Sequence, residues 1–98
     1  MYPVYSLVHL ILIIFEPMRV IAEVPHPRFK IQIFGYNAKY ILKIELGQFE
    51  QSFKINETDV NGTEDIERMI TAEFLSNCLH RFIQMRSDWE TAFKSKDQ

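Results

Sequence analysis

The chain has 98 residues, which is the length of a single domain. Its formal net charge of −2 at pH 7 provides no surplus of positive charge, which argues against a protein built to bind nucleic acid. Hydrophobic residues make up 47% of the chain and aromatic residues 13%, enough for a packed core and too many for a disordered chain. The single cysteine, Cys78, excludes an intramolecular disulfide and indicates a reducing compartment, so we expect a cytoplasmic protein.

Residues 1–17 form an apolar extension that differs from the rest of the chain. No Lys or Arg precedes Arg19, which argues against a secretory signal. The apolar stretch is also too short for a membrane span, and His9 interrupts it. Three interpretations are open: Met18 is the true start, the extension is a weak anchor or signal, or it adds a strand or helix. A membrane partner is expected only if the extension is an anchor.

Apolar and polar residues alternate in four successive segments, at 19–24, 28–34, 40–46 and 49–55. Side chains on a strand point to opposite faces in turn, so this period of two predicts an antiparallel sheet with one buried face. The segment 19–24 is a short candidate strand that places Val20, Ala22 and Val24 on one face, and we expect a sheet of three or four strands. Short turn signals separate the segments, as expected for a meander.

The first hairpin turn is predicted at Tyr36-Asn37, because Asn tolerates the positive φ of a tight turn. With these two residues as the loop, Ile33 lies opposite Tyr40 and Ile31 lies opposite Leu42. All four side chains then share the buried face. A slip of one residue would turn the whole apolar set toward water, so the pattern favours this face strongly.

The second hairpin turn is predicted at Gly47-Gln48, with Gly at the first central position as a type II′ turn requires. This register places Gln51 on the buried face, where it needs a hydrogen-bond partner. On the outer face it sets Glu45 opposite Glu50, a like-charge pair that a diagonal contact from Lys43 to Glu50 would relieve.

From residue 63 onward the pattern is that of helices. Thr63 is a candidate cap for a short helix, and Thr71 is a candidate cap for a long one, each with acidic residues in the first turn. Apolar residues then recur at three- and four-residue steps, which predicts one buried helix face that includes Trp89 and Phe93. The members of this series are Leu75, Cys78, Leu79, Phe82, Met85, Trp89 and Phe93.

These elements predict an α+β fold, in which a three- to four-stranded antiparallel meander is covered on one face by a short helix and the long C-terminal helix. Residues 18–94 form the predicted domain, and residues 95–98 form a polar tail that frays.

No set of residues in the sequence indicates a catalytic, cofactor or metal site. The three histidines, His9, His26 and His80, lack the spacing of metal ligands, and Cys78 belongs to the apolar helix face. The chain has three glycines and no glycine-rich phosphate loop, and its serines lack a nucleophile-elbow context. We therefore expect no enzyme, no metal and no cofactor.

Two apolar residues are predicted to point outward among lysines on the exposed sheet face, namely Phe34 and Ile41. They are either an interaction patch or the place where residues 1–17 pack. The leading functional hypothesis is accordingly a non-enzymatic protein-binding module or accessory subunit, with a homodimer as one form of it, which uses this patch or the edge strand 19–24.

Two other functions stay open. A nucleic-acid accessory protein of a phage or mobile element would use the basic residues near the C-terminus, which are Arg81, Arg86, Lys94 and Lys96. A small hydrolase would need a pocket with a perturbed titratable pair, and the sequence indicates none.

The stretch from Met18 to Phe93 resembles short uncharacterised bacterial proteins that are often encoded near phage or mobile-element genes. The segments that carry the resemblance are KIQIF at 30–34, KYILKI at 39–44 and FEQSF at 49–53. It implies a small bacterial α+β protein, and it carries no motif with a known role, so it assigns no site residue.

Overall fold

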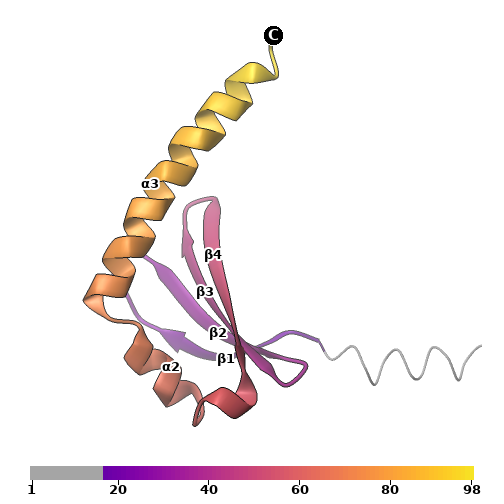
Figure 1. The fold of residues 1–98 in the computed structure, drawn as a ribbon, viewed down its shortest axis with the longest axis vertical. Helices are drawn as coiled ribbons and strands as arrows, with labels where there is room; N and C mark the ends of the chain where they lie inside the picture. The colour runs from indigo at the N-terminus through magenta and orange to yellow at the C-terminus, as the bar shows by residue number, and fades with distance from the viewer. Residues whose placement is uncertain (1–16) are drawn as a thin grey trace, which may run out of the picture.

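The computed structural model describes residues 17–98, which form an α+β fold (Figure 1). Four antiparallel strands pair in the order β1-β2-β3-β4, as predicted for a meander. Apart from Pro17, the apolar extension at 1–17 and its three interpretations lie outside the described residues. The elements in chain order are β1 (Arg19–Val24), β2 (Lys30–Tyr36), β3 (Lys39–Leu46), β4 (Phe49–Asn56), the 3₁₀ turn η1 (Glu57–Asp59), α2 (Thr63–Met69) and α3 (Ala72–Ser95).

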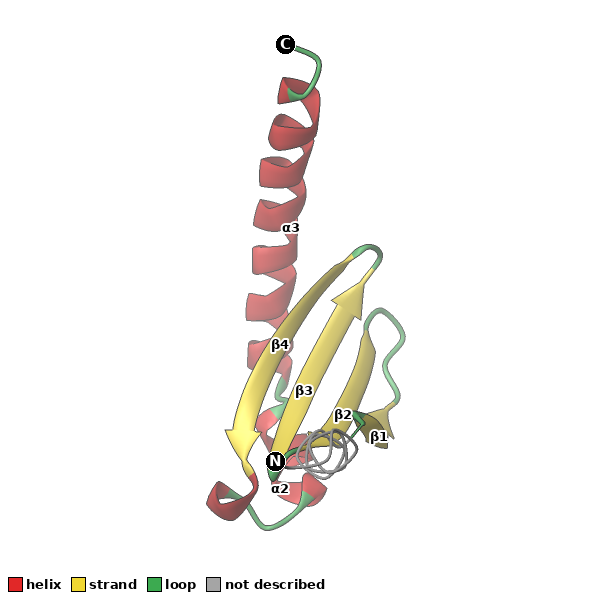
Figure 2. Ribbon diagram, turned by 90° about the vertical axis from the view of Figure 1, so that its right-hand side faces the viewer, coloured by secondary structure: helices red, strands yellow, loops and turns green. Residues whose placement is uncertain are grey.

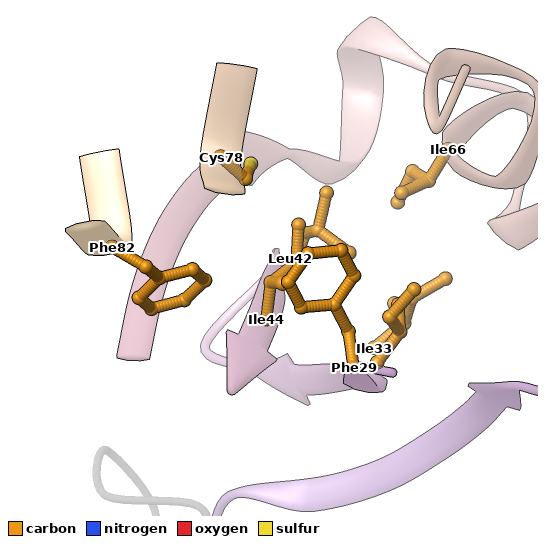
Figure 3. Packing of buried hydrophobic residues seen from close by; sticks show 8 residues of the cluster. Phe29, Ile33, Leu42, Ile44, Ile66, Cys78 and Phe82 are labelled. Atoms are coloured by element: carbon orange, nitrogen blue, oxygen red, sulfur yellow. The ribbon is translucent and has the colours of Figure 1, made fainter. Parts of the chain in front are cut away.

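Both α-helices lie on the same face of the sheet, as two perpendicular views show (Figures 1 and 2). The inner sheet face meets them with residues such as Ile33, Leu42 and Ile44, each at most 2% exposed. Figure 3 shows Ile66 of α2 and Cys78 and Phe82 of α3 pointing into this set. The predicted buried face is therefore correct, and the sheet and helices share one core.

The turn between β2 and β3 differs from its prediction. Its two loop residues are Asn37 and Ala38, with φ of +47° and +59°, and Tyr36 pairs with Lys39. The predicted loop Tyr36-Asn37 was therefore wrong by one position, which shifts the strand pairing by two residues. Two consecutive positive φ values are typical of a type I′ turn, whose twist matches that of the strands. Because the shift is even, every side chain stays on its predicted face.

The turn between β3 and β4 has the predicted register. Gly47 has a φ of +62°, and Glu45 pairs with Glu50 across the hairpin. The amino group of Lys43 lies 3.1 Å from a carboxylate oxygen of Glu45 and 3.0 Å from one of Glu50. The like-charge pair is thus bridged by a cation, as the sequence predicted.

The edge strand β1 contains a bulge between Val20 and Ala22. At this irregularity Ile21 lies over Gly35 of β2, so closely that a Cβ on Gly35 would be 2.3 Å from the Ile21 Cδ1 atom. A larger residue at this position would have to displace the tip of the exposed Ile21 side chain, and the bulge keeps β1 from forming a regular edge.

The two helix starts differ from each other. Thr71 caps α3 as predicted, because its hydroxyl accepts a hydrogen bond of 3.1 Å from the Phe74 N–H. The predicted cap of α2 was wrong: Thr63 is its first helical residue, and Gly62, with a φ of +85°, precedes it. Gly62 has no side chain to cap with, and the carboxylate of Asp65 accepts the N–H of Asn61 just before the helix.

Helix α3 is longer than the sheet that it covers. Its 24 residues span about 36 Å, whereas a strand of eight residues spans roughly 26 Å. Both views show its C-terminal half extending past the β3–β4 turn (Figures 1 and 2). The prediction that Trp89 and Phe93 belong to the core was therefore wrong, because none of the strands in residues 17–98 lies beneath them: Trp89 is 50% exposed and Phe93 is 54% exposed.

Candidate functional site

The predicted outer patch offers little apolar surface. Phe34 and Ile41 lie on the outer sheet face, as expected, and the corrected register makes them direct partners across β2 and β3. Ile41, however, is only 7% exposed, and Phe34 is half-buried with the Lys43 amino group 5.5 Å from its ring centroid. An interaction surface at this place stays a prediction, and it would have to form mainly through the polar groups around these two residues.

Polar side chains on the outer sheet face bind one another. Hydrogen bonds to Glu50 and then to Glu45 raise the pKa of Lys43 above its usual value. Gln32, which is 9% exposed, donates a hydrogen bond of 3.0 Å to the carboxylate of Glu23 on β1. The Lys43 amino group and the Gln32 side chain are therefore already bonded to carboxylates of this same protein.

Arg81, the first of the four basic residues considered for nucleic-acid binding, takes part in the fold. Its Nε donates a hydrogen bond of 2.8 Å to the Gln51 side-chain oxygen, and Gln51 in turn donates one of 2.8 Å to the Cys78 carbonyl. Gln51 thereby has the partner that its inward position required. This chain of hydrogen bonds ties α3 to β4, and it leaves Arg81 less able to reach a phosphate.

The other basic residues on α3 are interspersed with acids. Lys96 forms an ion pair of 2.9 Å with Asp97, and Asp88 and Glu90 lie between Arg86 and Lys94 in the chain. A phosphate-binding surface usually presents clustered positive charge. The end of α3 instead presents charges of both signs.

Residues 17–98 include two histidines, His26 and His80, and one cysteine, Cys78. The ring Nδ1 of His26 accepts hydrogen bonds of 3.1 Å from the N–H groups of both Arg28 and Phe29, which orders the connection between β1 and β2. Cys78 is buried, and His80 is exposed on α3. No group of three or more His, Cys, Asp or Glu residues among those described is arranged to hold a metal ion.

A hollow of about 370 Å³ lies between this connection and the start of α3. Phe29, Leu75 and Leu79 form its apolar wall. The His26 Nδ1 atom at its rim already accepts two backbone N–H groups, and the other polar side chains in its lining are those of Arg28 and Ser76.

One uncovered apolar surface of the described residues lies on the C-terminal half of α3. We call it the α3 stripe and define it as Met85, Trp89, Ala92 and Phe93. Met85 is half-buried at the border of the sheet, and the rings of Trp89 and Phe93 lie 6.2 Å apart. The Lys96 amino group lies 4.5 Å from the Phe93 ring centroid, at the far end of the stripe.

The α3 stripe continues the buried face of the same helix. Trp89 is seven residues after Phe82, about 20° short of two full turns, and Phe93 is eleven residues after it, about 20° past three. Phe82 points at the sheet, where its ring stacks on Phe29 with the centroids 5.9 Å apart. Trp89 and Phe93 therefore point to the same side of the helix as the core does.

The sequence contained the signal for this surface, although we interpreted it as core. The apolar series runs along the whole length of α3, but the longest strands have eight residues. Comparing these two lengths would have shown that the last turns of the helix lack a sheet to cover them. No helix among residues 17–98 has both the length and the apolar character needed to cross a membrane.

Comparisons of the chain with protein-family models, with curated proteins and with solved structures found no match.

Proposed function

We propose that this protein is a non-enzymatic protein-binding module or accessory subunit that binds through the α3 stripe. The proposal depends on one observation: two neighbouring aromatic side chains, Trp89 and Phe93, are exposed. They lie on the core-facing side of α3, in the part of the helix that extends beyond the sheet. A helix that binds only its own sheet has no need of an apolar face beyond the sheet.

The chemistry of the stripe supports a protein partner. Trp is among the residues that contribute most to binding energy at protein interfaces, and aromatic rings provide large contact areas at a small cost in side-chain entropy. Charged residues of both signs, such as Arg86, Asp88 and Glu90, border the stripe. This arrangement of an apolar centre with a polar rim is the usual anatomy of such interfaces.

We place this activity in the cytoplasm. The chain has one cysteine, which is buried in the core and forms no disulfide. A small protein in a reducing compartment depends on its core in this way, whereas small secreted domains commonly depend on disulfides.

The proposal is tested by capturing partners from a lysate of the source organism with three immobilised proteins. They are the wild type, the double variant Trp89→Lys/Phe93→Lys, and the control Ile83→Lys. Ile83 is 59% exposed and lies about 120° around the helix and about 9 Å along it from Trp89, so it is an equally exposed apolar residue outside the stripe.

We expect a defined protein, which includes the possibility of this same chain, to be retained by the wild type and by Ile83→Lys and lost with the double variant. Identical sets of retained proteins for all three would contradict the proposal.

A further inference from the structure

We propose that the hollow between the β1–β2 connection and the start of α3 binds a small carboxylate with an apolar body. The hollow is lined from α3 by residues of its first two turns, such as Leu75 and Leu79. The α3 stripe begins only at Met85, so the two surfaces are separate. The inference therefore goes beyond the proposed function and does not depend on it.

The apolar wall of the hollow is already in place in the free protein. Phe29 is 6% exposed, and its ring stacks on both His26 and Phe82, with centroid separations of 5.0 and 5.9 Å. Leu75 and Leu79, both half-buried, complete the wall from α3. Because these side chains are held by the core, a ligand that covers them costs little ordering of the protein.

The rim of the hollow is held by the connection between β1 and β2. Pro25 and Pro27 stand on either side of His26 and restrict the backbone there. The N–H groups of Arg28 and Phe29 both donate hydrogen bonds of 3.1 Å to the His26 Nδ1 atom. The imidazole ring therefore has a fixed place between the connection and the apolar wall.

Three side chains offer hydrogen-bond donors to the hollow. Because His26 Nδ1 accepts two hydrogen bonds, the neutral ring carries its proton on Nε2, which makes that atom a donor. The Arg28 guanidinium and the Ser76 hydroxyl line the same hollow. Within residues 17–98, none of the ion pairs involves Arg28, so its charge is open to a ligand.

The charge of the lining favours an anion. Among the described residues that line the hollow, Arg28 is the cation and none is a carboxylate. Glu73 lies in the first turn of α3 but is not part of the lining. A guanidinium binds a carboxylate through two parallel hydrogen bonds, and an apolar body on the same molecule would cover the wall. A phosphate ion would leave the wall uncovered.

The volume of the hollow sets the size of the ligand. It is about 370 Å³, within the range of roughly 300–1,000 Å³ that is common for small-molecule sites. At roughly 30 Å³ for each heavy atom, the share that a water molecule takes in the liquid, it holds about a dozen heavy atoms. Octanoate is close to this size. Since several lining residues are exposed, we expect a Kd on the order of 0.1–1 mM.

The first test is an NMR titration of the ¹⁵N-labelled full chain with octanoate, octanol and acetate. Octanol has the apolar chain without the charge, and acetate has the charge with only a methyl group. We expect octanoate to give saturable shifts at the amide signals of Arg28, Phe29 and Leu75. Octanol should bind roughly three- to tenfold more weakly, and acetate should show no saturable binding.

The second test separates the charge from the apolar wall. Arg28→Gln should weaken octanoate binding roughly three- to tenfold and leave octanol binding unchanged, because it removes only the charge. Ser76→Phe should abolish the binding of both, because its ring occupies the hollow. Lys54→Gln is the matched control, since it removes an exposed cation from the opposite face of the sheet and should change neither affinity. All three substituted side chains are exposed, and thermal scans confirm that the variants are folded.

The results that would overturn the inference are distinct. The absence of saturable shifts at the lining residues with octanoate overturns the site. Equal affinities for octanoate and octanol, or octanoate binding that Arg28→Gln leaves unchanged, overturn the carboxylate as the recognised group. Shifts confined to Trp89 and Phe93 place octanoate on the α3 stripe and also overturn the hollow as its site. The lysate capture tests the protein partner of the stripe separately.

Discussion

Ala38 is the one alanine in the described chain that the backbone holds at a positive φ, and replacing it with glycine should stabilise the protein. Its φ of +59° lies in the left-handed region, which costs an L-residue with a Cβ roughly 1–2 kcal/mol. Glycine adopts this conformation without that cost, but its unfolded chain is more flexible, which removes about 0.4–1 kcal/mol of the benefit.

The methyl group of Ala38 is exposed, so its removal loses no packing. The Ala38 carbonyl accepts a hydrogen bond of 3.1 Å from the Glu57 N–H, and glycine retains that carbonyl. The net expectation for Ala38→Gly is a gain of about 0.5–1 kcal/mol in the free energy of unfolding. In a domain of this size, such a gain raises the Tm by roughly 2–8 °C.

Urea denaturation of wild type and Ala38→Gly at one protein concentration measures this difference. Gly47→Ala is the matched control, because Gly47 has a similar φ of +62° and an added Cβ there would touch nothing within 4 Å. We expect the control to lose about 0.5–1 kcal/mol, because the left-handed cost of alanine is partly offset by its stiffer unfolded chain. An unchanged or lower stability of Ala38→Gly would refute the type I′ geometry of the β2–β3 turn and the register that depends on it.

Three further predictions concern the helices. Phe82→Ala should cost about 3–5 kcal/mol of unfolding free energy because its ring is buried, whereas Phe93→Ala should change the stability of the dilute monomer by less than about 0.5 kcal/mol; equal losses in urea melts would contradict the fold. Thr71→Ala should cost about 1 kcal/mol through the lost cap of α3 while Thr71→Ser should not, as thermal melts of the two variants would show. The hydrogen bond from the Asn61 N–H, followed by the charge of Arg68, lowers the pKa of Asp65 below its ordinary value of 3.8. The ionised Asp65 carboxylate therefore contributes stability above pH 3.8, and this stability is lost as the pH falls through the pKa of the folded state. Acid titration of Asp65→Asn should therefore show a smaller loss of stability than the wild type, and identical acid profiles would refute the role of this carboxylate.

The sheet was predictable from the sequence because its signal is redundant. Four segments with a period of two all place their apolar residues on one face, and only an odd shift can change that face. For this reason an error of two residues in the pairing of β2 with β3 left Ile33 and Leu42 in the core. The error itself arose because Asn37 fits either position of a two-residue loop, and the sequence offers no glycine beside it to decide.

The candidate site was not predictable in the same way, because it depends on the relative sizes of elements. A periodic helix face is buried only where another element lies opposite it, and periodicity alone carries no information about where the sheet ends. Trp89 and Phe93 therefore had the pattern of core residues without the partner that makes a core. Ile41 is the opposite case, since its outward position predicted exposure, yet its neighbours on the outer face leave it buried.

Trp89 is the only tryptophan in the chain, so its fluorescence tests the central claim most directly. The account predicts an exposed ring at high dilution, with red-shifted emission that acrylamide quenches readily. Blue-shifted emission that acrylamide quenches poorly would show a buried ring and would contradict the account.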